Sequence, residues 1–147
     1  MRLESYSVFA EENLMTIDFF SEGPKGIIKK RIEFQSTKNE RIFNLAFGDV
    51  DSVTNDFDDS TITNNNDSRK VLSTVAMSVS LFLLKYPDAF VIAEGNTASR
   101  TRLYRMGISN NLEEFSENFN IFGFNEKGNW VEFKINENYS SFYIKRK

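Results

Sequence analysis

Residues 68–86 have the sequence SRKVLSTVAMSVSLFLLKY, and their apolar side chains recur at the spacing of an α-helix. Those on the principal face are Val71, Leu72, Val75, Ala76, Val79, Phe82, Leu83 and Tyr86. Asn66 or Asp67 can cap the start, and Pro87 stops the helix just beyond its end. Met77, Leu81 and Leu84 widen the apolar surface beyond one stripe. We therefore predict a largely buried helix from Ser68 to Tyr86 that lies across a sheet.

The residues before this helix have the pattern of antiparallel strands. Met15, Ile17 and Phe19 alternate with polar residues, and residues 22–26, EGPKG, form a turn signal. The next strand places Ile28, Ile32 and Phe34 on one face and Lys29, Arg31 and Glu33 on the other. A further strand carries Phe43, Leu45 and Phe47 and ends at Gly48 and Asp49. One apolar face and one polar face indicate a sheet that is covered on one side.

The residues after the helix predict a short central strand, further helices and more strands. The strand covers residues 90–93, and Asn96 or Thr97 can cap a second helix from Ala98 to Met106 that ends at Gly107. A short acidic helix is expected from Asn110 or Asn111 through Phe119. The remaining strands contain Phe122 and Phe124, then Val131, Phe133 and Ile135, and finally Phe142 and Ile144.

This order of elements predicts an α+β fold, with an antiparallel sheet packed against one long helix. The length of 147 residues and 40% hydrophobic content suit a single domain over residues 1–147. The absence of Cys and His removes thiolate nucleophiles, disulfides and the commonest general base. The first ten residues do not form a signal peptide, and no run approaches the ~18 apolar residues of a membrane span. We expect a cytoplasmic protein without membrane association.

An acidic segment from Asp49 to Asp67 precedes the long helix, and the formal net charge of the chain is −3. Its carboxylates are hard oxygen ligands that could hold Mg²⁺ or Ca²⁺. Residues 56–61, DFDDST, lack the glycine that a calcium loop needs for its sharp turn. We expect a solvated loop whose Asp and Asn side chains form turns and cap the helix, with no metal and no cofactor.

Cations gather around Gly95, where the central strand meets the second helix. Backbone N–H groups at a helix N-terminus can bind a phosphate or carboxylate, and Arg100, Arg102 and Arg105 could add contacts. At ~100° per residue, Arg100 lies about 160° from Arg102, so the three do not share one face. The alternative is salt bridging to Glu113, Glu114, Glu117 or the acidic segment.

A second basic region is the strand from Lys25 to Phe34, together with Arg41 and the C-terminal Lys145, Arg146 and Lys147. A sheet face with cations and exposed rings can bind a single strand of nucleic acid through phosphate contacts and base stacking. The candidate stacking rings are Phe20, Trp130 and Tyr143.

Three runs, NLAFGD at 44–49, VLSTVA at 71–76 and RTRLYR at 100–105, resemble those of a small bacterial family of unknown function. The resemblance covers nearly the whole chain and implies no activity. Residues 22–47, followed by a loop and the helix at 68–86, resemble more distantly the Whirly and related single-stranded-DNA-binding coactivator domains. That resemblance implies a curved antiparallel sheet backed by a helix, and a nucleic-acid ligand.

A competing resemblance is to the C-terminal half of the GNAT acetyltransferase fold, which has a helix, a strand, a helix and then strands. The run LYRMGI at 103–108 lies on the second of these helices. The resemblance implies that Tyr104 would protonate the thiolate of coenzyme A as a general acid. Residues 64–69, NNNDSR, contain no glycine where that family's pyrophosphate loop would lie.

We expect a non-catalytic binding module for nucleic acid or another phosphate-bearing ligand rather than an enzyme. The predicted ligand-binding residues are Lys29, Arg31, Arg100, Arg102 and Arg105, and charge reversal at these positions should abolish binding and flatten its salt dependence. The alternatives are an acyl-CoA-binding acetyltransferase fold and a protein-interaction module. An exposed strand edge would allow a homodimer.

Overall fold

The structure is a computed structural model that describes residues 4–58, 62–95 and 97–147. In these residues nine strands form one sheet against which two helices pack, which confirms the predicted α+β fold. The helices are α1 (Ser68–Lys85) and α2 (Ala98–Phe115). The strands are β1 (Phe9–Ala10), β2 (Thr16–Gly23), β3 (Gly26–Ser36), β4 (Ile42–Val50), β5 (Phe57–Asp58), β6 (Phe90–Glu94), β7 (Phe119–Phe124), β8 (Trp130–Glu132) and β9 (Ser141–Arg146).

The strands follow the order β1-β2-β3-β4-β6-β9-β7-β8, and β5 pairs with β4. β4 and β6 are parallel, so the sheet is mixed rather than wholly antiparallel as predicted. Parallel neighbours need a long crossover, and α1 provides it. The parallel pairing joins Ile42–Asn44 to residues 90–92 only, whereas β4 continues to Val50. β9 lies between β6 and β7 and pairs with both, so it joins β7 and β8 to the rest of the sheet.

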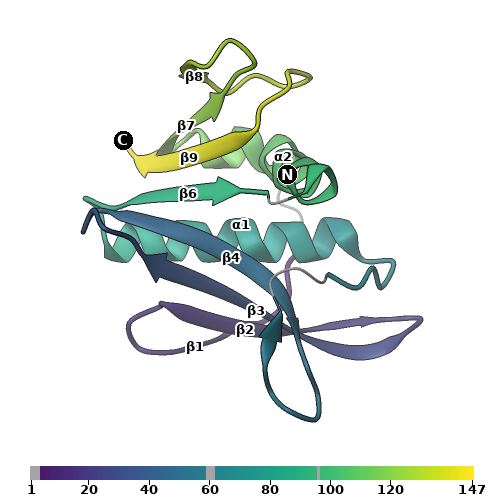
Figure 1. Ribbon diagram of the computed structural model, residues 1–147. Coiled ribbons are helices and arrows are strands. Elements are labelled where there is room, and N and C mark those ends of the chain that lie inside the picture. Colours follow the sequence, from purple (N-terminus) through teal and green to yellow (C-terminus); the bar gives the residue numbers. More distant parts are fainter. Residues whose placement is uncertain (1–3, 59–61, 96) are drawn as a thin grey trace.

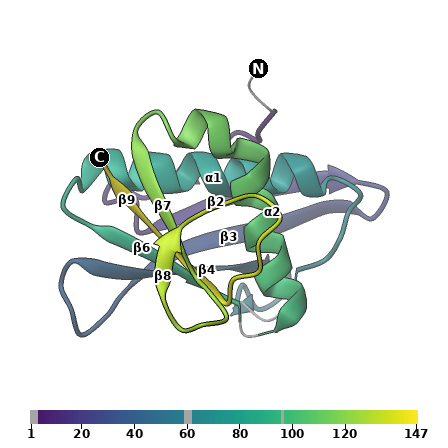
Figure 2. The same cartoon turned by 90° about the horizontal axis from the view of Figure 1, so that it is seen from above.

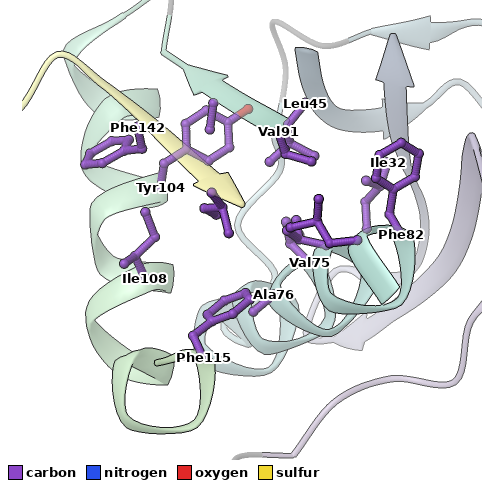
Figure 3. Packing of buried hydrophobic residues seen from close by; sticks show 14 of the residues in the cluster. Ile32, Leu45, Val75, Ala76, Phe82, Val91, Tyr104, Ile108, Phe115 and Phe142 are labelled. Carbon is purple, nitrogen blue, oxygen red and sulfur yellow. The ribbon is translucent and has the colours of Figure 1, made fainter. Parts of the chain in front are cut away.

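Both helices cover the same face of the sheet, and the opposite face is open in the described part of the chain (Figure 1 and Figure 2). The core lies between α1 and the sheet, where Val75 and Phe82 meet Ile32, Leu45 and Val91 (Figure 3). The Phe34 ring stacks on Phe82 with centroids 4.1 Å apart. Fully burying such a side chain contributes roughly 1.5–3 kcal/mol, so this layer dominates the stability of the fold.

The predicted first helix is confirmed, with Tyr86 as its C-cap residue. Asp67 occupies the N-cap position, but its side chain makes no capping hydrogen bond. Its Oδ2 instead accepts hydrogen bonds of 2.5 Å from both the Tyr6 and the Ser21 hydroxyl. Asp67 therefore connects the start of the helix to β2 and to the N-terminal segment.

The predicted end of the second helix at Gly107 is wrong, because α2 continues to Phe115. A Cβ on Gly107 would lie 3.5 Å from Leu72, so this glycine packs against α1 inside the helix. The predicted acidic helix from Asn110 or Asn111 is mostly the second half of α2. The predicted cap is confirmed at Thr97, whose side chain accepts from the Arg100 N–H, and Asn96 lies outside the described residues.

The predicted strand through Val131, Phe133 and Ile135 is also too long, since β8 ends at Glu132. The Phe133 N–H still donates to the Ile121 carbonyl oxygen and the Phe133 side chain is in the core, whereas Ile135 is exposed. The Tyr139 ring then occupies the space over Gly123, where a Cβ would come within 2.4 Å of the ring.

Among the described helices, neither is long and apolar enough to cross a bilayer.

Candidate ligand-binding face

The open face of the sheet carries aromatic side chains where β6, β9, β7 and β8 lie next to one another. Alternation along the strands points Phe90, Tyr143, Phe122, Phe124 and Trp130 away from the helices. The register places Tyr143 opposite Phe122, and Trp130 opposite Phe124. We call these five side chains the ring cluster.

The rings of this cluster contact one another around Tyr143. The Phe122 ring stacks on it with centroids 4.6 Å apart, and the Trp130 ring meets it edge-on at 5.0 Å. Phe124 lies 5.1 Å from Trp130, and Phe90 lies 6.1 Å from Tyr143. Trp130 is 42% exposed and the other four are half-buried. A contiguous aromatic patch of this kind is typical of an interaction surface.

Polar side chains border the ring cluster on the same face. Lys145 follows Tyr143 by two residues on β9, and its Nζ lies 5.8 Å from the centroid of the Phe90 ring. Asn120 is opposite Lys145, and the exposed Glu132 is opposite Phe122. In the part of the chain that the structure describes, neither Lys145 nor Glu132 forms an ion pair. Both charges are therefore available to a ligand.

Two of the three predicted stacking rings, Trp130 and Tyr143, lie together in the ring cluster. The third, Phe20, lies on β2 at the other end of the sheet, where its ring meets Phe9 edge-on at 5.8 Å. Phe90 and Phe122 were not among the predicted rings. Only the strand order shows that they belong to this cluster. β9 lies between β6 and β7, so Phe90 and Phe122 lie on either side of Tyr143.

Lys29 and Arg31 also lie on the open face, on β3 and away from the ring cluster. Arg31 donates to Asp18 through Nε (2.8 Å to Oδ1) and Nη2 (3.1 Å to Oδ2), and Lys29 Nζ lies 3.6 Å from Oδ2. The hydrogen bond to Asp18 raises the pKa of the Arg31 guanidinium. Since one carboxylate is shared by two cations, a phosphate here would have to compete with Asp18.

The three arginines of α2 do not form one site. Arg100 is buried, and its Nη1 donates to the carbonyl oxygen of Phe47 on β4. Arg102 is exposed, and Arg105 Nη1 donates to Asn138 Oδ1 at 2.7 Å. The structure therefore places the five predicted cations in two separate regions, and Arg100 joins α2 to the sheet.

Lys30 has a role that its place in a basic run did not indicate. Its side chain is fully buried, and Nζ lies 2.6 Å from Asp49 Oδ1 and 3.0 Å from the Thr63 carbonyl oxygen. Asp49 Oδ2 in turn accepts from the Thr63 N–H at 2.9 Å. The strand periodicity could have indicated this, because Lys30 lies two residues from Ile28 and two from Ile32 and so shares their face, the core face.

The acidic segment does not gather carboxylates for a metal within the described residues. Asp49 pairs with Lys30, while Asp51 accepts hydrogen bonds from the backbone N–H groups of Thr54 and Val53. These bonds lower the pKa of the Asp51 carboxyl and form the predicted turn. Asp59 lies outside the described residues.

Tyr104, the general acid that the acetyltransferase resemblance implies, is buried at 6% exposure. Its side chain lies in the core (Figure 3), and it lines a small apolar cavity with Leu45, Ala93 and Ile144. A separate recess of about 250 Å³ lies between β4, the start of α1 and α2. It is lined by Phe47, Ile62, Leu103 and Met106 among others, and does not include Tyr104.

Fold and site together define an α+β protein with one face of its sheet covered by two helices and a ring cluster on the other face. The chain belongs to a family of unknown function, DUF6934, whose model matches residues 2–147. This confirms the predicted membership in a family without an assigned activity. Neither a search of curated proteins nor a search of solved structures found a match.

Proposed function

We propose that this protein is a non-catalytic binding module whose ring cluster binds single-stranded nucleic acid. The observation that supports the proposal is the set of rings in mutual contact around Tyr143 on the open face. Stacking of a base on an aromatic side chain contributes about 1–3 kcal/mol per base and is available in single strands. Two or three stacked bases would account for binding without a strongly basic surface.

Charge plays a secondary part in this proposal, because the chain has a net charge of −3. Lys145 borders the ring cluster, and Lys147 follows it by two residues, in phase with Tyr143 and Lys145. These cations would contact the phosphates of a strand whose bases lie on the rings. Lys29 and Arg31 extend the same face and would be reached by a longer strand. Arg100, Arg102 and Arg105 belong to the helix side of the molecule.

The proposal is tested by removing one ring and measuring affinity for a labelled single-stranded oligonucleotide by fluorescence anisotropy. Tyr143→Ala should weaken binding about 5-fold or more, the loss expected for one stacked base. Phe20→Ala is the control, because it removes an exposed ring on the same face at the other end of the sheet. Equal affinity of wild type and Tyr143→Ala would contradict the proposal.

A second candidate function is binding of an acyl-CoA. The order α1, β6, α2 and then β7 to β9 is the order that the acetyltransferase resemblance implies, and the recess at Leu103 and Met106 could hold an apolar ligand. Thermal shift with ~1 mM acetyl-coenzyme A tests this candidate. A rise in Tm that is lost in Met106→Trp, which fills the recess, would favour it. An unchanged Tm would eliminate it.

A further inference from the structure

A second, smaller recess of about 170 Å³ adjoins the ring cluster. β8 pairs with β7 over residues 122–124, and one further hydrogen bond of 2.9 Å runs from the Phe133 N–H to the Ile121 carbonyl oxygen. The recess lies alongside Phe119–Ile121, where the chain leaves this edge of β7. Its lining includes Phe122 and four polar residues, Ser116, Asn120, Glu132 and Lys147, and it reaches the end of α2 through Leu112 and Ser116. Binding sites for drug-sized ligands have about 300–1,000 Å³, so this recess suits the edge of a single ring.

The polar groups of the recess have different chemistry. An ionised Glu132 carboxylate can only accept hydrogen bonds, whereas the Asn120 amide both donates and accepts. Glu132 lies directly across from Phe122 on the neighbouring strand, so the two side chains are neighbours on the open face. A carboxylate at this place would repel a phosphate, which leaves a hydrogen-bond donor on the base as the group it fits.

We infer that Glu132, together with Asn120, selects bases that carry an exocyclic amino group when they stack on Phe122. This inference rests on the proposed function of the ring cluster. Cytosine, adenine and guanine have such a donor, and Glu is a known acceptor for cytosine N4. Uracil and thymine present a carbonyl oxygen at the corresponding position, which would face the carboxylate. Glu132 is thus assigned as a specificity-determining residue.

The test compares oligo-dC and oligo-dU of 12 nucleotides at pH 7.5, because these bases have the same ring size and differ chiefly at position 4. Wild type should bind oligo-dC about 5-fold tighter or more, the lower end of what one good base contact contributes. Glu132→Gln should reduce the difference below about 2-fold, because its amide can donate to the uracil oxygen as well as accept. Glu113→Gln is the control, with the same charge change on the exposed surface of α2.

The outcomes separate this inference from the function on which it rests. Preference for oligo-dC in wild type and Glu113→Gln, with loss of preference in Glu132→Gln, supports the inference. Equal binding of both oligonucleotides by wild type overturns the base selection and leaves the ring cluster as a binding surface. A preference that persists in Glu132→Gln overturns the role of Glu132. Absence of binding to either oligonucleotide contradicts the proposed function itself.

Discussion

Among single residues, Lys30 and Asp49 join the sheet to the loop that precedes α1. Replacing Lys30 with Met should lower the free energy of unfolding by about 3–5 kcal/mol, because it leaves the Asp49 carboxylate partly buried without its cation. Urea unfolding followed by circular dichroism measures the change. Lys25→Met is the control, since Lys25 is exposed in the turn between β2 and β3. A loss below about 1 kcal/mol in Lys30→Met would show that the pair does not hold this loop.

The contribution of the Tyr6 hydroxyl to the free energy of unfolding should depend on pH in the alkaline range. Burial and the hydrogen bond to Asp67 raise the pKa of its hydroxyl above 10.0. The stabilisation from the protonated hydroxyl is therefore complete below about pH 10 and is lost as the pH rises through the raised pKa. Tyr6→Phe should cost about 1 kcal/mol of unfolding free energy at pH 7, and less at pH 11. A difference between the two proteins that stays constant from pH 7 to 11 would contradict this account.

Residue roles were predictable from the sequence where local geometry decides them. Thr97 caps α2 because it stands directly before the helix. Asp51 forms a turn because it accepts from a backbone N–H three residues further along the chain. The partners of Lys30, Arg31 and Asp67 come from other strands and loops, so composition alone could not assign them. The run of cations at 29–31 therefore contained one buried side chain and two that share a carboxylate.

At the level of elements, Gly107 distinguishes a continuous α2 from two helices. Gly107→Ala should stabilise the protein by about 0.5–1 kcal/mol, because Ala favours a helix interior and its Cβ would meet Leu72 at an ordinary 3.5 Å. Thermal or urea unfolding measures the effect. Gly128→Ala serves for comparison and should destabilise, since Gly128 has φ +82° in the turn before β8. Destabilisation by Gly107→Ala would instead indicate a helix end at this residue.

The long helix was predictable because its apolar spacing extends over five turns and is stopped by Pro87. The length of α2 was not, because a glycine followed by polar residues is also the local pattern of a helix end. Packing of Gly107 against Leu72 decides between the two, and that contact joins residues far apart in the chain.

For the whole molecule, the strand order determines what the open face can do. The half formed by β2 and β3 carries cations already paired with Asp18, and the half formed by β6 to β9 carries the ring cluster. Trp130 and Tyr143 were predictable as stacking rings because they alternate with core residues. Their grouping with Phe90 and Phe122 was not predictable, because it requires β9 to lie between β6 and β7. The proposed site therefore centres on the rings, and of the predicted cations Lys29 and Arg31 lie on the same face.

Trp130 is the single tryptophan of the chain and lies within the ring cluster, so its fluorescence reports directly on the proposed site. The most direct test is a titration with oligo-dC at 50 and 200 mM salt, followed by Trp130 emission. Stacking on the rings predicts saturable quenching. Contacts of Lys145 and Lys147 with two phosphates predict an affinity about 7-fold weaker at the higher salt. Emission that stays unchanged at 50 mM salt, under conditions where anisotropy detects binding, would place the nucleic acid elsewhere and contradict the account.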